Sequence, residues 1–90
     1  MRVLKAKIYG KVQGVWFRKY TFNFARGIGL VGMVKNLGDG TVLVNAVGLD
    51  KNIEQFKEFL GNGSPNSRVD RIDYSWEDLS IEYLTFDIEY

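Results

Sequence analysis

The sequence predicts an α+β fold, a two-layer sandwich in which two helices cover one face of a sheet in the order βαββαβ. Several segments alternate apolar and polar residues, as half-buried strands do, and two others carry apolar residues at helical spacing. The chain has 90 residues, 46% of them apolar, which is enough for one modest core. We therefore expect residues 1–90 to form a single domain.

The first half of the chain is predicted to form a strand, a helix and a β-hairpin. Residues 4–8 alternate apolar side chains with lysines, which indicates a strand. From residue 17 to residue 28 the spacing becomes helical, and glycines then end the helix. Residues 31–37 and 42–46 are predicted to be partner strands, because the Asp39-Gly40 pair between them favours a tight turn. The apolar positions of the helix are Phe17, Tyr20 or Thr21, Phe24 and Ile28.

The second half is predicted to add a helix and one or two strands. Asp50 is expected to be the N-cap of the helix, and the composition of residues 61–66 indicates a loop. Residues 69–76 alternate again and predict the fourth strand, while residues 84–88 suggest a short C-terminal edge strand. The apolar face of this helix comprises Ile53, Phe56 and Leu60.

Topology rules limit how these elements can be arranged. If each crossover is right-handed and leaves room for one strand, the result is an antiparallel sheet with strand order 4-1-3-2. The first and second strands then run in the same direction on either side of the third, with their ends roughly 10 Å apart at one sheet edge. The segment that follows the first strand, residues 10–18, should therefore face Asn36 at the end of the second strand.

The composition excludes several kinds of chemistry. The chain has no Cys and no His, so disulfides, thiolate nucleophiles, imidazole bases and Cys- or His-ligated metal sites are ruled out. No apolar run is long enough for a signal peptide or a membrane span, and we expect a cytoplasmic protein. Any reaction must use Arg, Lys, Asn, carboxylates, hydroxyls and backbone amides, and we expect neither a metal nor a cofactor.

The charges are unevenly distributed along the chain. Residues 1–45 contain eight Lys or Arg and one acid, a net charge of +7, whereas residues 46–90 contain four bases and ten acids, a net charge of −6. Such asymmetry can mark an anion-binding half. The simpler interpretation is that the two halves interleave in one fold and neutralise each other.

Residues 10–18, which we call the anion loop, carry the strongest functional signal. Gly10, Gly14 and Gln13 lead into a helix N-terminus, where free amides and the helix dipole favour an anion. Arg18 stands at the start of that helix, where a cation is disfavoured unless an anion is bound beside it. The alternative is that Arg18 extends into solvent or pairs with an acid. Asn36 could likewise be only a turn residue before Asp-Gly.

Two other patterns carry little functional weight. The glycines of the G-x-G-x-x-G run at residues 27–32 follow a helix and precede a strand, the reverse of the dinucleotide-binding context. The acids between residues 70 and 82 are expected to form a solvated face rather than a metal site.

Two segments resemble the signatures of the acylphosphatase family. Residues 10–18 (GKVQGVWFR) resemble the first signature and residues 32–42 (GMVKNLGDGTV) the second, and the likeness extends over essentially the whole chain. Two departures stand out. Trp16 replaces a residue that is often smaller and could narrow the mouth of the pocket, and Ser64 separates Gly63 from Pro65, where relatives often have Gly-Pro.

The resemblance implies a ferredoxin-like sandwich that hydrolyses the carboxyl–phosphate anhydride of acyl phosphates without a metal or cofactor. Arg18 would bind the phosphate, and Asn36 would position the attacking water. The partners would be a small-molecule acyl phosphate and the product inorganic phosphate, with neither nucleic acid nor membrane involved, and the protein would be a monomer. The implied substrate-binding residues are Gln13, Gly14, Val15, Trp16, Phe17 and Arg18.

Two other functions stay open. An RNA-binding module of similar architecture would use the basic half of the chain, but the sequence lacks the RNP1-type aromatic run that such modules carry. A non-catalytic relative could keep the fold and act within a larger assembly.

Overall fold

A computed structural model describes residues 2–80 and 82–90 of the chain. Strands and helices follow the predicted order, with one further strand at the end. The elements are β1 (Arg2–Lys11), α1 (Phe17–Gly27), β2 (Val31–Asn36), β3 (Val42–Val47), α2 (Asp50–Asn62), β4 (Arg68–Asp78) and β5 (Phe86–Glu89).

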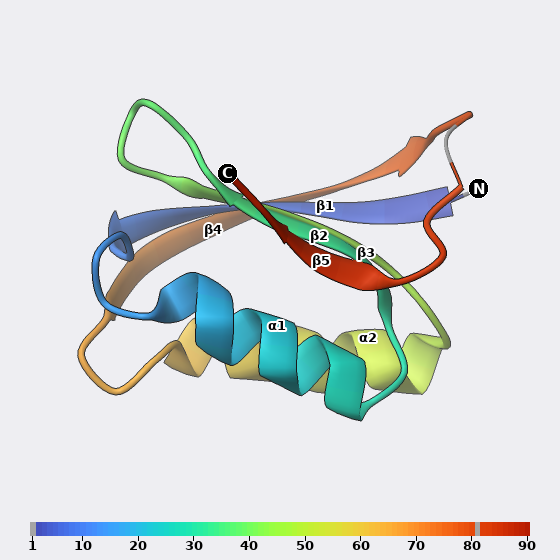
Figure 1. Ribbon diagram of the computed structural model, residues 1–90, viewed down its shortest axis with the longest axis horizontal. Coiled ribbons are helices and arrows are strands. Elements are labelled where there is room, and N and C mark those ends of the chain that lie inside the picture. Colours follow the sequence, from blue (N-terminus) through green and yellow to red (C-terminus); the bar gives the residue numbers. More distant parts are fainter. Residues whose placement is uncertain (1, 81) are drawn as a thin grey trace.

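The strands form one sheet in the order β4-β1-β3-β2-β5. The predicted order 4-1-3-2 is confirmed, and both helices lie on the same face of the sheet (Figure 1). The antiparallel pairing expected for the four main strands is confirmed, and the short C-terminal strand β5 pairs parallel with β2 through residues 86–89, so the sheet as a whole is mixed. The other pairings, β1 with β3, β1 with β4 and β2 with β3, are antiparallel.

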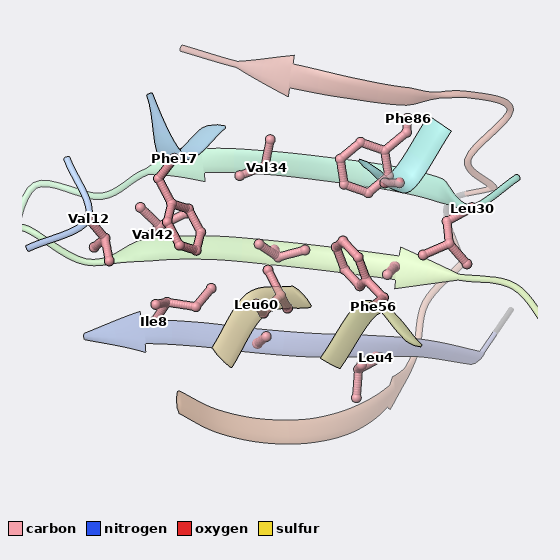
Figure 2. Packing of buried hydrophobic residues seen from close by; sticks show 14 of the residues in the cluster. Leu4, Ile8, Val12, Phe17, Leu30, Val34, Val42, Phe56, Leu60 and Phe86 are labelled. Carbon is pink, nitrogen blue, oxygen red and sulfur yellow. The ribbon is translucent and has the colours of Figure 1, made fainter. Parts of the chain in front are cut away.

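The core lies between the sheet and the two helices, where Phe17, Phe56 and Phe86 are fully buried (Figure 2). On α2 the predicted face of Ile53, Phe56 and Leu60 is buried. On α1 the buried residues are Phe17, Thr21 and Ala25, so Thr21 rather than Tyr20 occupies the inward position. Phe24 of α1 stacks on Phe59 of α2 at a centroid distance of 4.5 Å, which joins the helices on their outer side.

Two boundary predictions differ from the structure. Asp50 is the first residue of α2 rather than its N-cap, and the extended Leu49 occupies the cap position without a side-chain hydrogen bond. Leu84 is 82% exposed and precedes β5, because the parallel pairing with β2 begins at Phe86.

The two halves of the chain interleave within the sheet. The sheet places β4, from the acidic half, beside β1, from the basic half, and Lys5 pairs with Glu77 across this contact at 3.6 Å. This favours the simpler interpretation of the charge asymmetry. Among the described residues, neither helix is long and apolar enough to cross a membrane.

The direction of β1 and an irregularity near its end determine where the anion loop leaves the sheet. β1 and β2 run in the same direction on either side of β3, and the segments that follow them lie at the left end of the view in Figure 1. The register of β1 against β4 shifts between Tyr9 and Gly10. A Cβ on Gly10 would lie 2.0 Å from the carbonyl oxygen of Arg68, so only glycine fits where the anion loop leaves the sheet.

Candidate active site

A cleft of about 380 Å³ opens at this end of the sheet. Three parts of the chain line it: the anion loop with the first turn of α1, the last residue of β2, and the last residues of the chain. The predicted convergence of the anion loop with Asn36 is therefore confirmed. The lining residues are Val12, Gly14, Trp16, Phe17, Arg18, Lys19, Asn36, Ile88 and Tyr90.

The backbone of the anion loop ends at the N-terminus of α1. Gly14 and Trp16 have left-handed backbone angles, with φ of 73° and 64°, and α1 begins at Phe17. The amide of Tyr20 donates to the carbonyl of Trp16 at 3.0 Å, which is the first helical hydrogen bond. The preceding amides, from Phe17 to Lys19, have no acceptor within the helix. Together with the helix dipole, they favour an anion in this part of the cleft.

Arg18 lines the cleft without a carboxylate partner. None of the ion pairs among the described residues includes Arg18. Its Nη1 donates to the carbonyl oxygen of Glu89 at 3.4 Å, and its Cζ lies 4.9 Å from the centroid of the Tyr90 ring. The guanidinium therefore stands at a helix N-terminus beside Lys19, and the described residues that line the cleft include no Asp or Glu.

Asn36 presents an unused hydrogen-bond acceptor. It is the last residue of β2, and its Oδ1 is buried without a hydrogen-bond partner among the described residues. Leaving a buried acceptor unpaired costs ~1–3 kcal/mol, and such groups in native proteins call for an explanation. Asn36 is also one of the residues that line the cleft.

The anion loop is held in place by two side chains that connect it to other elements. Gln13 Nε2 donates to the carbonyl oxygens of Leu37 and Thr41, at 2.8 and 2.9 Å, and so ties the loop to the turn that follows Asn36. Ser64 Oγ donates to the carbonyl oxygen of Val15 at 2.7 Å and is itself buried.

The structure thus divides the six predicted substrate-binding residues into two groups. Gly14, Trp16, Phe17 and Arg18 line the cleft, whereas Gln13 and Val15 do not line it and instead take part in the contacts that brace the loop. Sequence reasoning missed four lining residues, Val12, Lys19, Ile88 and Tyr90, and the bracing role of Ser64. The separation of Ser64 from the loop, 49 residues, left no local signal for its role.

A model of the acylphosphatase family matches residues 4–88. This chain belongs to the acylphosphatase family. Bovine (Bos taurus) acylphosphatase-2 is 44% identical over 87 residues, which cover 93% of this chain and 88% of the bovine protein. The acylphosphatase of Mannheimia succiniciproducens is 48% identical over 71 residues, covering 76% of this chain and 79% of that protein.

Solved structures confirm the ferredoxin-like α+β fold of this acylphosphatase. The crystal structure of the Bacillus subtilis acylphosphatase matches with a TM-score of 0.93 and 34% identity over the full length of both chains. Full-length HypF, in its phosphate- and nucleotide-bound form, matches with a TM-score of 0.89 and 32% identity, covering 99% of this chain but 12% of HypF. The enzyme class is that of a hydrolase acting on acyl phosphates.

The turn between β2 and β3 of this acylphosphatase is fixed by Asp39. Its Oδ1 accepts hydrogen bonds from the hydroxyl and, at 3.0 Å, from the amide of Thr41, and its Oδ2 pairs with Lys7 Nζ at 3.0 Å. The hydrogen bonds from Thr41, and then that from Lys7, hold the pKa of the Asp39 carboxyl well below its ordinary value. Because Thr41 also accepts from Gln13, this carboxylate supports the contact between the turn and the anion loop.

We expect Asp39→Ala to lower the melting temperature at pH 7, with a difference from the native protein that shrinks as the pH falls below ~4. The pKa of Asp39 is lower in the folded than in the unfolded chain, so its stabilising effect is complete above the unfolded pKa and is lost as the pH falls toward the folded pKa. Thermal unfolding at pH 7, 4 and 3 measures this, with Glu58→Ala, an exposed carboxylate on α2, as the control. A difference that stays constant over this range would contradict the assignment.

Proposed function

We propose that this acylphosphatase hydrolyses acyl phosphates through a water held by Asn36, which attacks a phosphate bound by Arg18 and the amides of the anion loop. One observation carries the proposal: the same cleft is lined by Arg18, which forms no ion pair among the described residues, and by Asn36, whose buried Oδ1 has no hydrogen-bond partner among them. The first fits a phosphate, and the second fits a water beside it.

Arg18 and the helix N-terminus supply complementary contacts for a phosphate group. A planar guanidinium can donate to two phosphate oxygens at once, and the free amides from Phe17 to Lys19 can donate to the others. Lys19 adds a second positive charge to the cleft lining. These groups stabilise the charge on the phosphoryl oxygens, which is most of what a protein contributes to phosphoryl transfer.

The reaction needs no side chain that titrates near neutrality. The oxygen of the water forms a bond to phosphorus while the bond from phosphorus to the acyl oxygen breaks, and the electron pair leaves with the carboxylate. That carboxylate is a stable leaving group, since its conjugate acid has a pKa near ~4. A proton of the water passes to a phosphate oxygen. Asn36 contributes through its amide oxygen, which accepts a hydrogen bond from the other O–H group of the water and so fixes the direction of attack.

We expect hydrolysis of benzoyl phosphate to proceed at full rate in an excess of EDTA. The chain has no His or Cys, and within residues 2–80 and 82–90 no three acidic side chains are grouped as metal ligands. The assay compares initial rates with and without chelator and after addition of Mg²⁺. Activity that disappears on chelation and returns with Mg²⁺ would overturn the metal-independent mechanism.

A second candidate function is that of a recognition domain within a larger assembly. It is favoured by the match to HypF, in which a domain like this one makes up a small part of the chain. The same assay separates the two candidates, because a pure recognition domain would not hydrolyse benzoyl phosphate by itself. A salt-dependent RNA-binding titration, run alongside, tests the nucleic-acid alternative.

A further inference from the structure

The residues that line the cleft fall into two chemical groups. Arg18, Lys19 and Asn36 are polar or positively charged, whereas Trp16, Ile88 and Tyr90 are apolar or aromatic. The two aromatic side chains of the second group are unusually open to solvent: Trp16 is 71% and Tyr90 92% exposed. Single exposed apolar side chains are common on protein surfaces, but here two exposed aromatic residues line the same cleft, and such grouping can mark a ligand-binding groove.

Trp16 is also poorly suited to its backbone position. It is the one non-glycine residue with positive φ among the described residues, and side chains with a Cβ are disfavoured in this region. It is the N-cap residue of α1 but makes no side-chain cap hydrogen bond, where Ser, Thr, Asp, Asn or Gly would be preferred. Trp16 therefore breaks the local rules for conformation, capping and burial together. Such positions are expected where function, not stability, selects the residue.

Tyr90 lies next to the part of the cleft where the phosphate would bind. The centroid of its ring is 4.9 Å from Cζ of Arg18, and the backbone of the preceding residue, Glu89, accepts a hydrogen bond from the same guanidinium. In an acyl phosphate, a single oxygen separates the phosphorus from the acyl carbon. An acyl group on a phosphate bound by Arg18 is therefore within reach of the aromatic rings.

We propose that Trp16 and Tyr90 bind the acyl group, and that this enzyme prefers acyl phosphates with an aromatic or large apolar acyl group over small ones such as acetyl phosphate. The inference rests on the proposed function, since Arg18 must hold the phosphate for the acyl group to contact these residues. Trp16 and Tyr90 are then specificity-determining residues, and the unfavourable backbone conformation of Trp16 is retained because this residue lines the cleft.

The test compares kcat/KM for benzoyl and acetyl phosphate in the native enzyme and in Trp16→Ala, Trp16→Gly and Tyr90→Ala. We expect each variant to lower the benzoyl-to-acetyl ratio between about threefold and tenfold, the value of one aromatic contact. Taking the ratio removes effects on phosphate binding that both substrates share. Trp76→Ala, which removes a half-exposed indole of β4 outside the cleft, should leave the ratio unchanged.

Thermal unfolding supplies a readout that separates specificity from structure. Trp16→Gly should raise the melting temperature, because glycine relieves the left-handed strain, while it lowers the substrate ratio. A ratio that is unchanged in Trp16→Ala, Trp16→Gly and Tyr90→Ala would overturn the inference.

A binding measurement keeps this inference separate from the proposed function. Benzoylphosphonate and acetylphosphonate, which cannot be hydrolysed, are titrated against the native protein and Trp16→Ala. A native preference for benzoylphosphonate that Trp16→Ala removes supports the inference even if no acyl phosphate is hydrolysed, in which case the proposed function alone fails. Equal affinity of the native protein for both phosphonates would overturn the inference that Trp16 and Tyr90 bind the acyl group.

Discussion

Arg18→Lys is expected to lower kcat/KM for benzoyl phosphate by about 10³-fold, the lower end of what a well-placed arginine contributes to phosphoryl transfer. The substitution keeps the charge but not the shape: an ammonium is a point charge, whereas the guanidinium can hold two phosphate oxygens in fixed geometry. Lysine also loses the present anchoring of the side chain by the carbonyl oxygen of Glu89 and the ring of Tyr90. The measurements are the steady-state kinetics and the Ki of inorganic phosphate. As kcat/KM falls, this Ki should rise.

The matched control for this variant is Arg26→Lys. Arg26 lies in the last turn of the same helix, where its guanidinium stacks near Phe22 rather than lining the cleft. Its replacement should leave kcat/KM and the Ki of phosphate within about twofold of native values, since surface substitutions of this kind change the fold little. Near-native turnover and phosphate affinity in Arg18→Lys would show that Arg18 does not bind the phosphate.

The strand order and the convergence of Arg18 and Asn36 could be predicted because both depend on local periodicity and general topology rules. Apolar alternation and helical spacing gave the element order, and right-handed crossovers then placed β1 and β2 on either side of β3. This arrangement also predicts that the C-terminal ends of β1 and β2 lie at the same edge of the sheet. No tertiary contact had to be known to bring Asn36 opposite the anion loop.

The remaining parts of the cleft depend on contacts between distant segments. Ile88 and Tyr90 reach the cleft because β5 pairs parallel with β2, and nothing in the short alternation near the chain end specifies its partner or direction. Gln13 is polar, and the sequence predicts that it binds the substrate. In the structure its side-chain amide instead donates hydrogen bonds to the carbonyl oxygens of Leu37 and Thr41, which lie 24 and 28 residues further along the chain. The chemistry of such a side chain is visible in the sequence, whereas its partner is not.

Asn36→Ala is expected to separate binding from chemistry. Removing the amide leaves Arg18 and the loop backbone in place, so the Ki of inorganic phosphate should stay within about twofold, because those groups supply the phosphate contacts. The value of kcat should fall by at least ~10²-fold, the loss expected when a reacting water is no longer positioned. Since Oδ1 of Asn36 has no hydrogen-bond partner among the described residues, its removal breaks no hydrogen bond of that oxygen within the described chain, and the variant should stay folded.

Two further variants decide what the loss of rate in Asn36→Ala means. Asn66→Ala, in the exposed loop before β4, should leave kcat unchanged and serves as the control for loss of an amide. Asn36→Asp keeps an acceptor oxygen but introduces a negative charge beside the phosphate, so it should raise the Ki of phosphate, which alanine does not. Circular dichroism and thermal unfolding establish that each variant is folded before its kinetics are compared. A folded Asn36→Ala protein with native turnover would show that Asn36 is only the residue that ends β2, and that another group positions the attacking water.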